Sequence, residues 1–358
     1  MNAASILGTL VYRSPADAAD YLSVSVFNLK EIEDALLLLS HPSLPVQYSM
    51  ILLRYCMVPK LTYLIRTLAP SCIYDTCKKF DAMIMECVFR LLSLNDVPAS
   101  TMTPDILRKQ LQLRCRMGGW GLTSQARVCH FAYLDSLSQA IFQDTHTSDI
   151  FSRPSKLLVD KVDSILHGLT DEFKTLPRTA AAFIAESRLP RKQDDTHSLQ
   201  KTLSHDAHKH SYSELCDYFS CRKDLFQQAR LIAIQAPAAS RWKTTLPNES
   251  DCRLDCDSYV VAARMNLGVA PYGNMPDHCG YCMKRIGSVG ADSLHALSCV
   301  YLKGRQVTQR HDAVQDAVAE YAVRAGVPVF KHQCTLRYVV KNTKANDASI
   351  DSVAVSES

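Results

Sequence analysis

The stretch LKEIEDALLLLSH, residues 29–41, decides the fold class of the chain. Its spacing places Ile32, Leu36 and Leu39 on one face of a helix and charged residues on the other. This is the period of an amphipathic α-helix. The segment YDTCKKFDAMIMECVFRLLSL, residues 74–94, has the same period. The front of the chain is therefore predicted to be a bundle of helices.

Helical patterns continue through most of the sequence. Residues 103–113 begin with Thr103 as a helix N-cap and Pro104 at the first helical position. The glycine cluster RMGGWGL that follows predicts a tight turn. Further helices are predicted at 126–142, 156–173, 212–236 and 253–268. The polar residues 187–213 predict a linker.

The end of the chain has a different pattern. Residues 310–326 end in a glycine and predict one more helix. Residues 327–341 alternate between apolar and polar side chains, which indicates strands. The predicted fold class is therefore mainly α, with a short α/β tail.

Composition limits the classes of protein. The 358 residues are enough for two or more domains, and a net charge of +4 is compatible with a nucleic-acid partner. No apolar run reaches the roughly 18 residues of a membrane span, so no membrane partner is expected, and no small-molecule substrate is evident. With no secretory signal in view, the 14 cysteines predict free thiols in the nucleus or cytoplasm. Five of them have apolar neighbours and are predicted to be buried: Cys56, Cys72, Cys77, Cys87 and Cys129.

The stretch HCGYCMKRIGSVGADSLHALSC, residues 278–299, has the spacing of a metal site. Cys279 and Cys282 form a Cys-x2-Cys turn, and His295 and Cys299 form a His-x3-Cys pair whose members lie one helical turn apart. Four such ligands fill a tetrahedral shell, which leaves no position for a catalytic water. The sequence therefore predicts one structural Zn²⁺, which would order a loop that has no large apolar core.

Two other groups are weaker candidates for metal ligands. His205, His208 and His210 lie in a polar stretch and are more typical of a solvated face. Cys252 and Cys256 lie near the predicted finger, but its four ligands are already complete. His278 is adjacent to Cys279, and the spacing favours leaving it out.

Several segments, in their order along the chain, resemble the carboxy-terminal part of a non-LTR retrotransposon polyprotein, downstream of the reverse transcriptase active site. LPVQYSMILLRYCMVPKLTYLIRTLAP resembles the thumb helices, and RMGGWGLTSQARVCHFAYLDSL the glycine-rich stretch after them. QARLIAIQAPAASRWKTTLP and AARMNLGV resemble the connector. HCGYC, DSLHALSC and RHDAVQDAVAEYAVRAG resemble the Cys/His finger and the start of a restriction-like endonuclease. ILGTLVYRSPADAADYL departs at residues 11–14 from the family's LG-x-P-x-G pattern.

The resemblance implies four regions. They are the end of the palm and a thumb-like helical bundle at 1–145, a helical connector at 146–250, a C2HC zinc-finger region at 251–305 and a truncated endonuclease segment at 306–358. Two sets of basic residues are candidates for contacts with phosphates: Arg108, Lys109, Arg114 and Arg116 before the glycine turn, and Lys284, Arg285, Lys303, Arg305 and Arg310 around the finger.

The catalytic residues of the family are missing or weakly matched. The paired polymerase aspartates have no counterpart, because Asp194 and Asp195 lie in a polar connector. Asp347 and Asp351 are weak candidates for the acids of the nuclease, although Ala345 and Asn346 replace the basic–proline pair.

The predicted function is therefore that of a DNA- or RNA-binding fragment of a retrotransposon reverse transcriptase protein, without polymerase or nuclease activity of its own. The parent family comprises RNA-directed DNA polymerases with an endonuclease. One alternative is a metal-dependent endonuclease that acts on DNA target sites. The other is a degenerate, zinc-stabilised structural product without activity.

Overall fold

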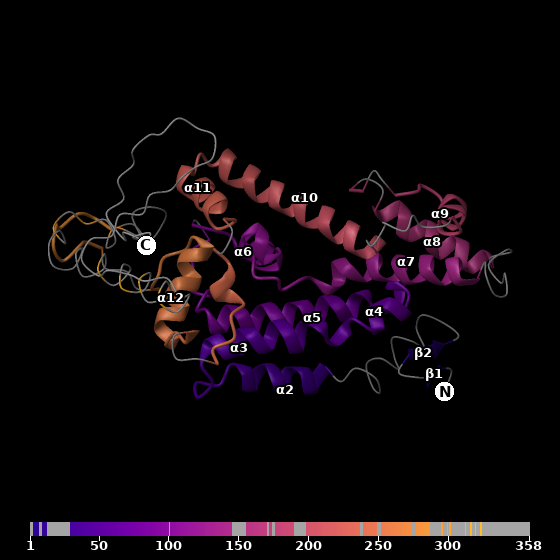
Figure 1. Cartoon of the computed structure of the whole chain (residues 1–358), viewed down its shortest axis with the longest axis horizontal. Helices are drawn as coiled ribbons and strands as arrows, with labels where there is room; N and C mark the ends of the chain where they lie inside the picture. Colours follow the sequence, from indigo (N-terminus) through magenta and orange to yellow (C-terminus); the bar gives the residue numbers. More distant parts are fainter. Residues whose placement is uncertain are drawn as a thin grey trace, which may run out of the picture. The chain divides into compact units, whose positions relative to one another are not determined.

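A computed structural model describes residues 3–6, 9–12, 29–99, 101–144, 155–169, 172–173, 176–189, 198–236, 239–248, 252–273 and 277–286, and the single residues His295, Cys299, Tyr301, Asp312, Asp316, Ala319 and Val323. These parts are mainly helical, as predicted (Figure 1). Contacts divide the chain into two units, Met1–Met275 with Ser288–Ser293, and Pro276–Gly287 with Leu294–Ser358. The predicted zinc-finger region starts at residue 251, but residues 252–273 lie in the first unit.

The first unit begins with an antiparallel hairpin of β1 (Ala3–Ile6) and β2 (Thr9–Tyr12). Helix α2 (Leu29–Leu39) buries Ile32, Leu36 and Leu39, so the predicted apolar face is confirmed. Next come α3 (Val46–Leu52), the π-helical turn η2 (Leu53–Met57), the 3₁₀-helix η3 (Val58–Leu61) and α4 (Leu64–Thr67). The α-helical ladder breaks around Pro59, because proline has no N–H to donate.

The centre of the first unit is built on α5 (Pro70–Leu91), α6 (Pro104–Gln112), the 3₁₀-helix η4 (Cys115–Met117) and α7 (Gln125–Asp144). α7 packs against α4 and α5. Its N-terminus is tied to α5 because Asp81 accepts hydrogen bonds from the hydroxyl of Ser124 and the backbone N–H groups of Gln125 and Ala126. A carboxylate at a helix N-terminus offsets the unpaired N–H groups there.

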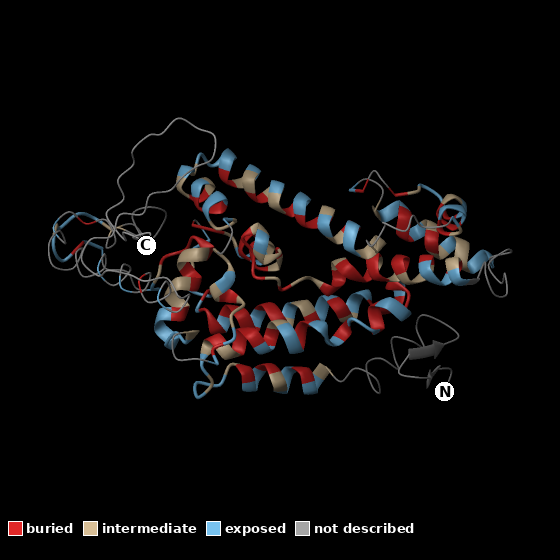
Figure 2. Ribbon diagram, in the orientation of Figure 1, coloured by how far each residue is buried: buried red, intermediate tan, exposed pale blue. Residues whose placement is uncertain are grey.

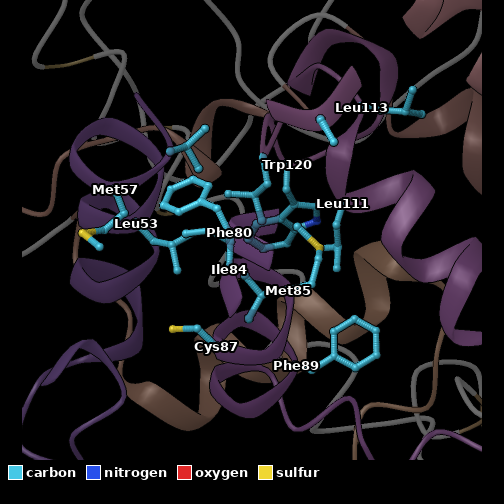
Figure 3. Close-up of a cluster of buried hydrophobic side chains, with 14 of the residues drawn as sticks. Leu53, Met57, Phe80, Ile84, Met85, Cys87, Phe89, Leu111, Leu113 and Trp120 are labelled. Carbon is cyan, nitrogen blue, oxygen red and sulfur yellow. The ribbon is translucent and has the colours of Figure 1, made fainter. Parts of the chain in front are cut away.

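One apolar core joins α2–α7 to the later helices of the first unit. Figure 3 shows Phe80, Leu111 and Trp120 close together in it. Trp120 is 2% exposed in this core, and it meets the half-buried Trp242 edge to face at 5.6 Å between ring centroids. A second core forms where α8 (Lys156–Leu169) and α9 (Ala180–Ser187) pack with α7 and α10 (Leu199–Cys221).

The predicted linker at 187–213 is wrong for its second half. α10 runs over Leu199–Cys221, where only the part from Tyr212 was predicted to be helical. The residues at every fourth position of α10 face the core: Leu203, Ala207, Ser211, Leu215 and Phe219. Because Ala207 and Ser211 are small or polar, the helical period of apolar residues is not visible in the sequence. Figure 2 shows these buried positions along one side of the helix.

The last helices of the first unit are α11 (Leu225–Ala233), the 3₁₀-helix η6 (Arg241–Lys243) and α12 (Cys256–Leu267), and they carry the buried cations Arg230, Lys243 and Arg264. Arg230 donates to the side-chain oxygens of Gln227 and Gln110 at 2.6 Å and 3.1 Å. Lys243 Nζ donates to the carbonyl oxygen of Gly119 at 2.8 Å and to Asn266 Oδ1 at 3.1 Å. The N–H of Gly118 donates to the carbonyl oxygen of Cys115 at 3.1 Å and Gly118 has a φ of 82°, so the predicted turn is confirmed. Lys243 also holds this turn through Gly119.

Four of the five cysteines predicted to be buried are buried: Cys72, Cys77, Cys87 and Cys129. The prediction is wrong for Cys56, which lies on the exposed side of the π-helical turn. No helix in the described ranges combines the length and apolar character that crossing a bilayer requires. In the tail, Asp312, Asp316, Ala319 and Val323 are helical, while the predicted strands at 327–341 lie outside the described residues.

The start of α10 gives a first prediction. Ser198 is its N-cap, and the Ser198 hydroxyl accepts a hydrogen bond from the backbone N–H of Lys201 at 3.2 Å. Ser198→Ala should lower the free energy of unfolding by about 1 kcal/mol, because the N–H of Lys201 then loses its bond to the cap hydroxyl and keeps only the backbone carbonyl oxygen of Ser198. Urea unfolding of the whole chain measures this. Thr202→Ala, at an exposed position in the same helix, is the matched control and should change stability little. An equal effect of the two substitutions would contradict a helix that begins here.

Candidate metal centre

The second unit contains a tight backbone turn at Cys279–Cys282. The N–H of Met283 donates to the carbonyl oxygen of Cys279 at 2.9 Å, and the N–H of Cys279 donates to the carbonyl oxygen of Lys284 at 2.8 Å. His278 and Arg285 pair across the turn as an antiparallel bridge. Met283 has a φ of 56°, which lets the chain reverse direction directly after the second cysteine. We call residues 278–285 the knuckle.

Four side chains converge at the knuckle: Cys279, Cys282, His295 and Cys299. Their potential ligand atoms all lie within 4.8 Å of one another. The Sγ atoms of Cys279 and Cys299 are 3.7 Å apart, and Cys282 Sγ is 3.0 Å from His295 Nε2. Thiolates at about 2.3 Å from a tetrahedral ion lie about 3.8 Å from each other. The group is therefore arranged to hold a metal ion, and the four predicted ligands are brought together.

The backbone of the knuckle favours ionised sulfur. Hydrogen bonds from the backbone N–H groups of Cys282 and Tyr281 lower the pKa of Cys279 to about 6. The N–H of Lys284 points at Cys282 Sγ from 3.4 Å, but burial outweighs this donor and raises the pKa of Cys282. Metals bind the thiolate rather than the thiol, so the donors at Cys279 prepare that ligand for a cation.

The weaker ligand candidates do not join this group. Cys252 and Cys256 lie in the first unit, and Cys256 is exposed on α12. His205 and His210 are exposed on α10, and His208 is buried in the same helix. Among the described residues, the Cys3His group is the only arrangement found that can hold a metal ion.

The first set of basic residues does not form one surface. Arg108 is bonded to Asp105 at 2.9 Å, and Lys109 pairs with Glu214 on α10 at 3.0 Å. Arg114 is half-buried, and its guanidinium lies 3.4 Å from Nδ1 of His205. Arg116 is exposed on η4. Arg108, Lys109 and Arg114 line three different hollows, so only part of this set faces solvent without a carboxylate nearby.

Two residues of the second basic set lie on the knuckle. Lys284 and Arg285 are exposed there, beside the exposed side chains of Tyr281 and Met283, which are 63% and 70% accessible. Sequence reasoning missed Tyr281 and Met283, although Tyr281 stands inside the Cys-x2-Cys motif. Five other candidates lie outside the described residues: Lys303, Arg305, Arg310, Asp347 and Asp351.

No protein-family model, curated protein or solved structure matches the chain.

Proposed function

We propose that the second unit is a structural zinc module and that the chain uses it to bind nucleic acid. The observation that carries the proposal is the closed Cys3His group at the knuckle, with exposed basic and aromatic side chains beside it. Three thiolates and one imidazole are a donor set that suits Zn²⁺, and a complete shell suits a structural ion. The zinc would order the knuckle, and the knuckle would present its outer side chains.

The outer side chains of the knuckle have complementary chemistry for nucleic acid. Lys284 and Arg285 can neutralise phosphates, which gives affinity without sequence preference. Tyr281 offers an exposed ring on which a base can stack. Together they support binding to DNA or RNA with little sequence selectivity.

We further propose that the chain is a fragment of a non-LTR retrotransposon reverse transcriptase protein. The order of its segments supports this, with thumb-like helices, a connector and a finger in succession. On this proposal the chain keeps the nucleic-acid-holding parts of the parent enzyme. Polymerase activity is not expected, because no paired aspartates stand in a catalytic context in the sequence.

Duplex DNA tests the proposal. We expect the zinc-loaded chain to bind a labelled duplex, with a log–log salt slope of about −0.9 for each phosphate neutralised. The double variant Lys284→Glu, Arg285→Glu should weaken binding about tenfold or more on every sequence and reduce the magnitude of that slope by roughly 1 to 2. Fluorescence anisotropy at several salt concentrations measures both quantities.

A matched pair of lysines provides the control. Lys78 and Lys79 are adjacent and exposed on α5, so Lys78→Glu with Lys79→Glu makes the same charge change in the first unit. This control should bind DNA far better than the knuckle variant. A flat salt dependence, or equal losses in the two double variants, would argue against nucleic-acid binding through the knuckle.

A further inference from the structure

The first unit contains a hollow of about 340 Å³ between η2–α4, the glycine turn, α7 and α10. This volume is in the range of small-molecule sites, about 300–1,000 Å³. Its polar wall includes Arg54, Arg114, Thr123, Gln125, Ser204 and His208. The described residues that line it include no aspartate or glutamate. The hollow is therefore a concave site with cationic and neutral donors.

Arg54 is fixed at the edge of this hollow by the glycine turn. Its guanidinium donates to the backbone carbonyl oxygens of Trp120 and, at 3.4 Å, Lys243. Gly121 has a φ of 68°, and a side chain there would begin 2.8 Å from Arg54 Nη2. The glycine thus makes room for the guanidinium. A cation held in this way loses little entropy when it binds a ligand.

Positive charge in the hollow is not balanced by a carboxylate. Neither Arg54 nor Arg114 forms an ion pair within the described parts of the chain. The adjoining hollow, which shares Ser204 and His208, differs in this respect. Its cations Lys109 and Arg127 are paired with Glu214 and Glu172. The hollow that contains Arg54 and Arg114 therefore differs from the adjoining one, because its two guanidinium groups have no carboxylate partner.

The pKa of His208 is lowered by its burial and by the positive charges around the hollow. Burial, and then the positive charges of Arg114, Arg127 and His205, lower the pKa of His208 to about 4. Its imidazole is therefore neutral near pH 7 and offers one N–H donor. With the hydroxyls of Thr123 and Ser204 and the amide of Gln125, the wall carries neutral donors around its two guanidinium groups.

We propose that this hollow binds a phosphate group, held between Arg54 and Arg114. A guanidinium matches phosphate oxygens with two parallel N–H donors, and the neutral donors of the wall complete the shell. A bound anion would also offset the cost of keeping two cations partly out of water. The phosphate can belong to a free phosphate compound or to a nucleic-acid backbone. The second case rests on the proposed function, since Arg114 is one of the predicted phosphate contacts.

Two variants alter the hollow in different ways. Arg114→Gln removes one charge, and Arg178→Gln, at an exposed position outside the hollow and outside both predicted basic sets, is its control. Ser204→Asp adds a repelling charge on α10, and Thr202→Asp, exposed on the same helix outside the hollow, is its control. Circular dichroism establishes that each variant is folded. The probes are inorganic phosphate, measured by calorimetry, and a labelled DNA duplex.

We expect Arg114→Gln and Ser204→Asp each to weaken binding of at least one probe about tenfold, the size expected for a charge-assisted hydrogen bond, with both controls within about twofold of wild type. Loss of phosphate binding with unchanged DNA binding would support the hollow and assign it to a free phosphate compound. Loss on DNA alone would assign it to the backbone. If the variants match their controls with both probes, the hollow is not a phosphate site. Wild-type protein that binds phosphate but no DNA would refute the proposed function and leave the hollow intact.

Discussion

Cys282→Ser and Cys299→Ser are each expected to abolish stoichiometric zinc binding, while Cys256→Ser retains one zinc per chain. Cys282 and Cys299 belong to the converging group, whereas Cys256 is an exposed cysteine in the first unit. Elemental analysis of the purified proteins measures the stoichiometry. Unchanged zinc in both ligand variants would rule out the Cys3His site.

The loss of metal should also remove the structure of the knuckle. A structural zinc contributes roughly 10–16 kcal/mol of apparent binding free energy, more than a short turn with few apolar contacts can supply. Hydrogen exchange reads this directly at three amides whose bonds define the turn: Cys279, Met283 and Ile286. A chelator should expose these amides and leave the amides of α5 protected. Protection that persists in the knuckle after chelation would show that the fold there does not depend on the ion.

Local patterns predicted much of this protein. The apolar face of α2 and the start of α6 at Thr103–Pro104 both follow from residues within one or two turns of each other. The ligand set followed in the same way, because Cys-x2-Cys and His-x3-Cys are local spacings. Such features depend on backbone geometry over a few neighbouring residues, so they can be predicted from short segments of the sequence.

Long-range features could not be predicted in this way. The period of α10 is visible only if Ala207 and Ser211 are known to face the core, and the core that decides this comes from other helices. The hollow is harder still, because Arg54 and Arg114 are 60 residues apart and Arg54 is fixed by backbone carbonyl oxygens. Every residue has a backbone carbonyl group, so the residue types in the sequence do not reveal which ones accept hydrogen bonds from Arg54.

Lys243 is the buried cation with the most direct consequence for stability. Its side chain is 3% exposed, and its ammonium lies 5.3 Å from the centre of the Trp120 ring. Its hydrogen-bond partners are the neutral oxygens of Gly119 and Asn266. Burial, and then the charges of Arg54 and Arg230, lower the pKa of Lys243 from 10.5 to about 8, against the opposing influence of Cys115. The folded state therefore disfavours the charged form.

The sign of the pH dependence follows from this shift. Below pH 8 the lysine is charged in both states, and the full cost of its burial is present. Between the folded and unfolded pKa values the unfolded state binds more protons, so stability rises with pH in this window. A shift from 10.5 to about 8 corresponds to about 3 kcal/mol in all. Most of this gain, about 2 kcal/mol, should be reached near pH 9.5.

A comparison with Lys243→Met isolates this contribution. Burial also raises the pKa values of Tyr259 and Cys87, which lowers stability in alkali, but wild type and variant share those groups. Between about pH 7 and about pH 9.5, wild type should therefore gain about 2 kcal/mol relative to Lys243→Met. Lys60→Met, which removes an exposed lysine, should run parallel to wild type. Urea unfolding followed by tryptophan fluorescence is well suited, because the chain has two tryptophans and both lie in the aromatic cluster beside Lys243. Parallel curves for wild type and Lys243→Met would mean that Lys243 has the same pKa in the folded and unfolded chain. Burial would then not disfavour its charged form.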